Sequence, residues 1–372
     1  MPWPVLLMAR ELDLGGSERQ MALLARALDR ATFSPIVGCF RPAGFRASEL
    51  QNAGIPIQHF PIYSFLSTAA ATGALDLARF IRSRKIRLVH TFDYPLTAFA
   101  IPVTRLLTAA IPVSSQRSHR DLIPPPYHRI VRFTDRLASA IVVNCGSVRQ
   151  HLERDERVPP ARIRLCYNGI DLDEFCPAEA PRPAALPPDS IVIGAICALR
   201  PEKSLPDLLH AFAQIHRAHP ATSLAIVGSG PEQNTLHSLA RSIGILDRCV
   251  FEPATQQVPA WLRSIHIFVL PSRSEALSNS LMEAMACGCC CVASNVGGNP
   301  ELLQNGQTGL LFESQNIAAL ASALDLLIRD AALRKRLAAS ALHRVRTHFS
   351  IRASAQRMSE IYAELIDRRA RP

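Results

Sequence analysis

Two glutamates eight residues apart, Glu275 and Glu283, are the side chains in this sequence with the clearest potential for chemistry. The apolar run 265–270 before them is rich in β-branched and aromatic residues and predicts a buried strand. From about Asn279 the apolar residues recur at three-to-four spacing, which predicts a helix that ends at Gly288. Glu275 therefore belongs to the loop between strand and helix, and Glu283 lies about one turn into the helix.

The start of that helix offers backbone N–H groups to an anion, because the first amides of a helix lack partners within it and the helix dipole favours negative charge there. Carboxylates accept hydrogen bonds from sugar or ribose hydroxyls, so the whole arrangement suits a sugar diphosphate. For each glutamate alone, the alternative is a solvated side chain, in the loop for Glu275 and on the helix surface for Glu283. The predicted donor-binding residues at the helix start are Ser278, Asn279, Ser280 and Leu281.

A second group of charges follows another predicted strand, residues 191–197. Arg200 and Lys203 stand in the loop after it, before a helix predicted from about Pro206. The chain has only three lysines against 38 arginines, which makes a lysine at this strand end unusual. Two cations in such a loop can hold a diphosphate leaving group as negative charge develops on it.

The segment around the two glutamates resembles the E-x7-E signature of the family-four retaining glycosyltransferases, also called group 1, which have the GT-B fold. Glu275 and Glu283 occupy its acidic positions, and the CVAS strand and GG-x-PELL turn that follow also match. Two positions depart from the family pattern. The family usually has a proline where this chain has Cys290, and an arginine where it has Ala198. Arg200 is the predicted substitute for that arginine.

The resemblance implies a metal-independent transfer that needs no cofactor and uses a nucleotide diphosphate sugar as donor substrate. It implies that Glu275 orients the sugar and that Glu283 holds the ribose. Arg200, Lys203 and the helix start would take the leaving diphosphate, and backbone groups at Phe251 would lie near the nucleotide base. In the family the acceptor hydroxyl attacks from the leaving-group face, so no protein nucleophile is assigned.

Apolar and amphipathic segments alternate along the whole chain. This pattern predicts an α/β architecture of two Rossmann-like doubly wound parallel-sheet domains, and the GT-B resemblance implies that they face a cleft. We predict an N-terminal acceptor-side domain over residues 1–172, joined by a C-terminal helix over 350–372, and a nucleotide-sugar-binding domain over 190–349. An N-G-x-D turn ending at Asp171 marks the boundary, and the proline-rich residues 176–188 suit a semi-rigid linker.

The N-terminal half carries further polar residues at predicted strand ends, where such sheets bind ligands. A glycine pair ending at Gly16 lets a ligand approach the backbone, and the resemblance places this loop at the donor phosphates. His119 follows the strand near Val113 and is the candidate for contact with the transferred sugar, with Arg117 as an alternative alignment. His90 is a competitor, and a structural role in the core is open for either histidine.

Length and composition are those of a globular protein of two domains. No apolar run approaches the roughly 18 uncharged residues of a membrane span, and the first residues lack the basic start of a signal peptide, so we expect a cytoplasmic location. Ten scattered cysteines favour reduced, buried thiols, including the cluster 287–291. The D-x-D of Asp171 and Asp173 is interpreted as a turn rather than a metal site.

Positive charge is concentrated in the first half of the chain. Residues 1–170 hold 22 Arg and Lys against 12 Asp and Glu, whereas the remainder holds 19 of each. No nucleic-acid-binding motif accompanies this excess, so nucleic acid is not an expected partner. Because Phe65, Leu66 and the apolar stretch 96–107 lie near basic residues, we expect attachment to an anionic membrane surface, on the inner face of the membrane.

The sequence thus predicts a retaining hexosyltransferase that moves sugar to a glycan or lipid-linked acceptor in cell-envelope or exopolysaccharide synthesis. A catalytically silent GT-B homologue that binds a nucleotide or a partner is the alternative, which Ala198 and Cys290 keep open. An epimerase of the same fold would need an acidic and histidine acid/base set that the sequence does not reveal.

Overall fold

The structure, a computed structural model, describes residues 1–13, 15–62, 68–120 and 123–370. It divides into two compact units. Unit 1 comprises Met1–Gly169 and Ile351–Pro372, and unit 2 comprises Ile170–Ser350. The division therefore falls three residues before the predicted 172, and the proline-rich residues 176–188 belong to unit 2.

Unit 1 is built on a seven-stranded sheet whose neighbouring strands are all parallel, in the order β3-β2-β1-β4-β5-β6-β7. Strands β4, β5 and β6 are buried at every residue because the sheet is covered on both faces, although β4 and β5 end in polar residues. The strands are β1 (Trp3–Glu11), β2 (Phe33–Arg41), β3 (Ile57–His59), β4 (Leu88–Thr91), β5 (Ile111–Gln116), β6 (Ala140–Val143) and β7 (Ile163–Leu165).

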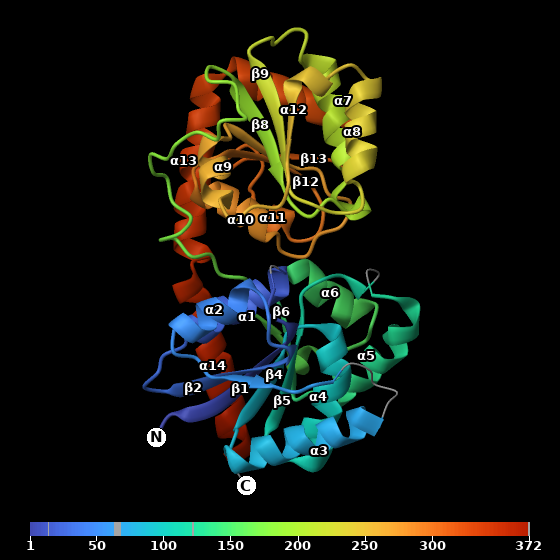
Figure 1. Ribbon diagram of the computed structural model, residues 1–372, viewed down its shortest axis with the longest axis vertical. Helices are drawn as coiled ribbons and strands as arrows, with labels where there is room; N and C mark the ends of the chain where they lie inside the picture. The colour runs from blue at the N-terminus through green and yellow to red at the C-terminus, as the bar shows by residue number, and fades with distance from the viewer. Residues whose placement is uncertain (14, 63–67, 121–122, 371–372) are drawn as a thin grey trace. The chain divides into compact units, whose positions relative to one another are not determined.

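Helices α1, α2 and α14 cover one face of this sheet, α3 and α4 cover the other, and α5 packs against α4 (Figure 1). Each face has its own apolar core, since a parallel sheet buries side chains on both sides. The helices are α1 (Gly16–Ala27), α2 (Phe45–Asn52), α3 (Thr68–Ser83), α4 (Tyr94–Leu107), α5 (Pro125–Leu137), α6 (Gly146–Arg154) and α14 (Ile351–Ala370), with a short 3-10 helix η2 (Pro160–Arg162).

Helix α14 returns the chain to unit 1, as the C-terminal helix predicted over 350–372 requires. It packs against α1, and its apolar residues recur at three-to-four spacing toward the sheet. Tyr362 is fully buried, and its ring meets the edge of Phe33 from β2 at 5.8 Å between centroids. The last helix of the sequence therefore completes the core of the first domain.

The apolar stretch 96–107 is mostly core, which corrects the expectation that it faces a membrane. It forms α4, where Leu96 and Ile101 are fully buried, and its exposed residues are Arg105, Leu106 and Leu107 at the end of the helix. The companion residues Phe65 and Leu66 lie outside the described residues. Within the described ranges, no helix is both long and apolar enough to cross a membrane.

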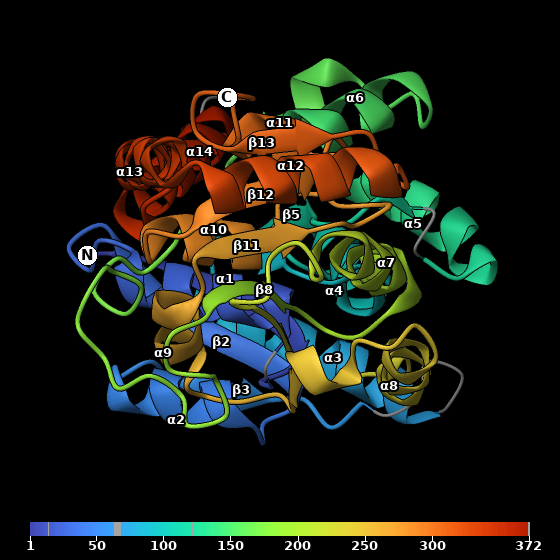
Figure 2. The ribbon, with the colours of Figure 1, turned by 90° about the horizontal axis from the view of Figure 1, so that it is seen from above.

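Unit 2 repeats the architecture with a six-stranded parallel sheet, in the order β10-β9-β8-β11-β12-β13. Figure 2 shows α7 and α8 on one side of β8 and β11, and α9, α10 and α13 on the other. The strands are β8 (Ile191–Ile196), β9 (Thr222–Val227), β10 (Cys249–Glu252), β11 (Ile267–Leu270), β12 (Cys290–Ser294) and β13 (Leu310–Phe312). The helices are η3 (Pro201–Lys203), α7 (Leu205–Ile215), α8 (Gln233–Ser242), η4 (Leu246–Arg248), α9 (Val258–Ser264), α10 (Asn279–Ala286), α11 (Asn299–Leu302), α12 (Ile317–Arg329) and α13 (Ala331–His348).

Candidate active site

Lys203 and Glu275 form an ion pair at the carboxyl ends of the central strands of unit 2. Lys203 ends η3 after β8, and Glu275 lies in the loop after the adjacent strand β11. The Lys203 Nζ atom donates to Glu275 Oε1 at 2.5 Å, and the Ser272 hydroxyl donates to the same oxygen at 2.7 Å. Glu275 is only 9% exposed, so the alternative of a solvated loop glutamate is wrong.

The charge of Lys203 is stabilised by this partner. Burial alone lowers the pKa of the ammonium, but the Glu275 carboxylate and its hydrogen bond outweigh that effect, with smaller contributions from Cys197 and Glu202, and the pKa is raised. The lysine therefore remains a cation throughout the physiological range. A charged donor held this way can also interact with a second anion, because an ammonium has three N–H groups.

Arg273 ties the two loops together and was not singled out from the sequence. Its backbone N–H donates to the Glu202 carbonyl at 2.8 Å, and its side-chain Nε donates to the Ser204 hydroxyl at 3.0 Å. The hydroxyl of Ser204 in turn donates to Asp207 at 2.7 Å. Arg273 is thus a cation fixed beside the Lys203 loop, a position that sequence spacing could not reveal because the contact joins residues about 70 positions apart.

Two glycines let neighbouring loops reach the backbone of this site. A Cβ on Gly297, whose φ is +55°, would lie 1.8 Å from the Glu275 carbonyl oxygen, and one on Gly228, at φ +145°, would lie 1.9 Å from the Cys197 carbonyl oxygen. No other residue fits such contacts, and both φ values also favour glycine. Gly297, in the GG-x-PELL segment, and Gly228, which follows β9, therefore allow close contact with the loops that carry Glu275 and Lys203.

Helix α10 begins beside Glu275, as the sequence predicted. The Ser278 side chain caps it by accepting from the Leu281 N–H at 3.3 Å and also contacts Ser280 Oγ at 3.2 Å. The Leu281 amide is therefore engaged by the cap, whereas Asn279 and Ser280 form the first turn of the helix. The Leu281 amide is therefore removed from the set of backbone N–H groups that we predicted to bind an anion.

Glu283 is not a surface residue. It is the fifth residue of α10 and is 4% exposed, which excludes the solvated alternative for this glutamate. A carboxylate enclosed by a protein needs hydrogen-bond partners to offset its lost hydration. Glu283 therefore either holds α10 in place through hydrogen bonds within the protein or lines a ligand site with its carboxylate.

Arg200 is held less firmly than Lys203. Its side chain is 63% exposed and lies 3.9 Å from a Glu202 oxygen, a separation typical of a weak surface pair. Ala198, at the position of the family arginine, is also exposed. The predicted substitution of Arg200 for that arginine stays a prediction, and Arg273 is a second cation in the same region.

Phe251 lies in the edge strand β10, where it pairs in register with Ile226 of β9. The imidazole of His237, from α8, stacks on its ring with centroids 3.9 Å apart. Sequence analysis did not single out His237. The aromatic pair fixes the side chain of Phe251, while the predicted role of its backbone at the nucleotide base stays a prediction.

The remaining predicted residues, Gly16 and His119, belong to unit 1. Gly16 begins α1, and the Glu18 carboxylate folds back so closely that a Cβ on Gly15 would lie 2.0 Å from its oxygen. His119 follows β5, with Nε2 3.4 Å from Ser147 Oγ and its ring 5.5 Å from that of His151. The predicted site residues thus form two groups, one in each unit.

Of the alternatives to His119, His90 is a core residue and Arg117 is a fixed cation. His90 is fully buried and bonded at both ring nitrogens, to Tyr362 at 2.6 Å and to Ser115 at 2.8 Å. Arg117 donates to Asn168 at 2.6 Å, and burial lowers its pKa to about 10. The structural role left open for His90 is confirmed.

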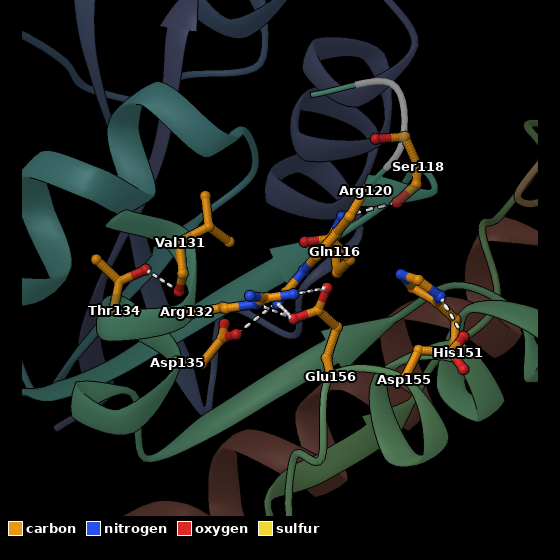
Figure 3. Close-up of polar contacts among 10 residues, drawn as sticks. All are labelled: Gln116, Ser118, Arg120, Val131, Arg132, Thr134, Asp135, His151, Asp155 and Glu156. Atoms are coloured by element: carbon orange, nitrogen blue, oxygen red, sulfur yellow. Dashed lines mark hydrogen bonds and ion pairs between the residues drawn. The ribbon is translucent and has the colours of Figure 1, made fainter. Parts of the chain in front are cut away.

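A buried ionic network under helix α5 was also missed. The Arg120 guanidinium, 2% exposed, pairs with Asp135 of α5 and lies 3.0 Å from Glu156, and Glu156 also binds Arg132 of α5 at 2.6 Å (Figure 3). Burial raises the pKa of Asp135, whereas the two arginines outweigh burial and lower that of Glu156. Two cations and two anions balance one another here and hold α5 to the segment after α6.

The possible metal ligands considered from the sequence have ordinary roles in the structure. Asp171 accepts from the Asp173 N–H at 3.1 Å, which is a turn contact as predicted. The cysteines at 287 and 289–291 are buried free thiols, and burial raises the pKa of each. In the part of the chain that the structure describes, no group of three or more His, Cys, Asp or Glu side chains is placed to hold a metal.

Comparison with solved structures supports the two-sheet architecture. A crystal structure of Anabaena HepE in complex with UDP aligns over 98% of this chain and 100% of its own, with a TM-score of 0.81 at 20% identity. A glycosyltransferase from Rickettsia africae aligns over 98% and 99%, with a TM-score of 0.84 at 19% identity. The predicted fold, two parallel-sheet α/β domains of the GT-B class, is confirmed.

Sequence comparison gives the family. A D-inositol 3-phosphate glycosyltransferase from Stackebrandtia nassauensis is 32% identical over 264 residues, 66% of this chain and 59% of that relative. A glycogen synthase from Mycobacterium tuberculosis is 33% identical over 204 residues, 54% and 48% of the two lengths. The matches thus span less than two thirds of either relative. The family model for glycosyltransferase family 4 matches residues 14–174 and that for glycosyl transferases group 1 matches residues 178–344, so the chain belongs to this glycosyltransferase family.

Proposed function

We propose that this protein transfers a sugar from a nucleotide diphosphate sugar to a glycan or lipid-linked acceptor. The observation that carries the proposal is the Lys203–Glu275 ion pair, placed at adjacent strand ends beside the first turn of α10. The cation and the helix N-terminus can bind the diphosphate and stabilise the negative charge that develops on it in the transition state. The carboxylate can accept hydrogen bonds from the sugar hydroxyls.

In the proposed reaction Lys203 and the α10 start stabilise the diphosphate as it leaves, and Glu275 orients the sugar through its hydroxyls. Glu283 holds the ribose. The acceptor hydroxyl attacks from the leaving-group face, so the anomeric configuration is retained and no metal or cofactor is needed. The charge on the leaving group is then stabilised by protein groups alone, which is why the loss of a single cation would be costly.

Arg273 is the better placed of two candidates to supply the second positive charge that Ala198 lacks. Its guanidinium Nε donates to the Ser204 hydroxyl at 3.0 Å, whereas the Arg200 guanidinium makes one weak contact, 3.9 Å from Glu202. A cation that is already oriented loses less side-chain entropy on binding. We expect Arg273→Ala to lower turnover more than Arg200→Ala, and the opposite order would make Arg200 the substitute.

The proposed donor class is supported by relatives whose structures hold such molecules. The HepE protein has been crystallised with UDP and with UDP-glucose. For this chain we propose a nucleotide diphosphate sugar without choosing among UDP, GDP and ADP. The proposed setting is cell-envelope or exopolysaccharide synthesis on the cytoplasmic side, with a peripheral contact to the inner face of the membrane.

The test is donor-dependent release of the free nucleotide diphosphate by the purified protein. A screen of thermal stabilisation by UDP-, GDP- and ADP-sugars selects the donor, since a ligand that binds the folded state raises its apparent stability. Slow release of diphosphate from that donor, accelerated by an acceptor and abolished in Glu275→Gln, is the expected result. Stabilisation without any release would instead support the catalytically silent homologue.

A further inference from the structure

Helix α5 of unit 1 has an unusual distribution of polar and apolar side chains. It buries Thr134 and Asp135 together with Val131, whereas its larger apolar side chains Ile130 and Phe133 are 43% and 54% exposed. A helix on the surface of a globular domain normally turns such residues inward. The exposed Ile130 and Phe133 therefore call for a partner that is absent from the folded unit.

The exposed apolar pair lies on one continuous stripe of the helix. Positions three and four residues apart share a helix face, and this spacing joins the two apolar residues with three arginines. The exposed residues of the stripe, which we call the α5 face, are Arg129, Ile130, Arg132, Phe133 and Arg136.

This face is presented by a firmly held helix. Arg120 beneath α5 pairs with Asp135, and Glu156 pairs with both Arg120 and Arg132 (Figure 3). These bonds join α5 to the end of β5 and to the segment after α6. The outward orientation of Phe133 is therefore a property of an anchored helix and not of a frayed end.

The surroundings of the α5 face carry uncompensated positive charge. Among the described residues, Asp135 of α5 and Glu156 are the acidic side chains that pair with Arg120 or Arg132, and both belong to the buried network. Within the described ranges, Arg129, Arg136 and the exposed Arg157 have no ion-pair partner, and Arg162 donates to backbone carbonyls at the α5 C-terminus, at 3.1 Å for that of Arg136. The face thus combines an apolar centre with a basic border.

We propose that the α5 face binds the surface of an anionic lipid bilayer. A helix that presents aromatic and aliphatic side chains between arginines can insert the former into the headgroup boundary, while the latter contact anionic headgroups. A second copy of this chain fits less well, because a symmetric contact would bring the same arginines face to face. The proposal deepens the proposed function, since it names the surface through which a lipid-linked acceptor would be reached.

The test is co-sedimentation of the full chain, without donor, with vesicles of phosphatidylcholine alone or mixed with phosphatidylglycerol. We expect binding to the anionic vesicles only, weakened by high salt because screening shortens the range of the attraction. The double variant Ile130→Ser/Phe133→Ser should reduce partitioning at least tenfold, and Arg129→Gln/Arg136→Gln should do the same. Leu326→Ser is the matched control, since Leu326 is 45% exposed on α12 of unit 2, and it should bind like the wild type.

Two results would overturn the proposal. One is failure of the wild type to bind anionic vesicles, and the other is wild-type binding by the serine double variant. The serine double variant replaces exposed side chains, so thermal unfolding should show it as stable as the wild type. Because vesicle binding is measured without donor and diphosphate release without vesicles, failure of the membrane proposal is distinguishable from failure of the proposed transferase activity.

Discussion

Both units contain a buried ion pair formed by residues far apart in the sequence, and the two pairs differ in one respect. In unit 1, Arg120, Asp135 and Glu156 are each under a tenth exposed at their side chains and neutralise one another in a closed network. In unit 2, Lys203 is 18% exposed and its pair with Glu275 lies at strand ends beside a helix start. The first pair joins two elements, while the second holds charges where a ligand can bind.

The difference follows from the cost of burying charge. An ion pair in a protein interior contributes stability only when geometry and further hydrogen bonds offset the lost hydration, and breaking such a pair is expensive. A closed network can meet this condition permanently. An open pair such as Lys203–Glu275 leaves N–H groups of the ammonium unused, so under the proposed function we expect its contribution in catalysis rather than in folding.

The largest expected effect is on folding, from Arg120→Met. Removing the guanidinium leaves two buried carboxyl groups without their shared partner, which should lower the free energy of unfolding of unit 1 by about 3–5 kcal/mol. Urea unfolding followed by Trp3 fluorescence in a Trp261→Phe background would report unit 1, since the two tryptophans of the chain lie in different units. Arg149→Met, which breaks an exposed pair with Glu153, is the control and should cost at most about 1 kcal/mol. Equal losses in the two variants would show that the network does not hold unit 1 together.

Lys203→Ala should lower the rate of sugar transfer more than it lowers stability. If its ammonium stabilises charge that develops on the leaving diphosphate, turnover should fall roughly 100- to 1000-fold, as for loss of one preorganised transition-state donor. Its stability loss should be smaller than for Arg120→Met, because Glu275 keeps the hydrogen bond from Ser272. The exposed Lys335→Ala is the matched control. A change confined to KM would contradict the transition-state role.

Glu283→Ala should weaken nucleotide binding. Ribose hydroxyls would lose a charged acceptor, and each hydrogen bond to a charged group contributes roughly 1.5–3 kcal/mol, so affinity should fall at least about tenfold. Titration calorimetry with the nucleotide diphosphate selected by the donor screen measures this directly. Unchanged affinity would show that Glu283 does not contact the nucleotide and that its carboxylate only holds α10 in place.

The sequence was sufficient to predict two parallel-sheet α/β domains, because strand and helix periodicities are local and their alternation is typical of parallel sheets. It also indicated Glu275 and Lys203, whose motifs and strand-end positions lie within short segments. Contacts between residues far apart in the sequence could not be predicted from it. Arg273 bonds to Ser204, and Arg120 to Asp135 and Glu156, across loops whose approach depends on packing.

The orientation of helix α5 could not be predicted from its sequence, for a different reason. Ile130 and Phe133 have the spacing of a core stripe, and apolar periodicity identifies a helical face without saying whether the protein or another partner covers it. The polar residues that face inward, Thr134 and Asp135, are accommodated only because Arg120 pairs with the carboxylate. Their burial could not be deduced without that partner.

The smallest expected effect tests whether the two units differ in their response to acid. Burial, reinforced by the nearby Arg117, lowers the pKa of His90 well below its usual 6.5, so the folded imidazole stays neutral while the unfolded one gains a proton as pH falls. The contribution of neutral His90 to the free energy of unfolding is therefore complete above pH 6.5. It decreases below that pH by up to about 1.4 kcal/mol per pH unit. Lys203 has a raised pKa, so its contribution to the free energy of unfolding is complete below about pH 10.5 and does not change in this range.

Unfolding of unit 1 should be measured between pH 5 and 8 in the wild type and in His90→Gln. Below pH 6.5 the free energy of unfolding should depend less steeply on pH in the variant. Parallel curves would mean that His90 titrates normally, and the core role inferred from its two hydrogen bonds would then be wrong.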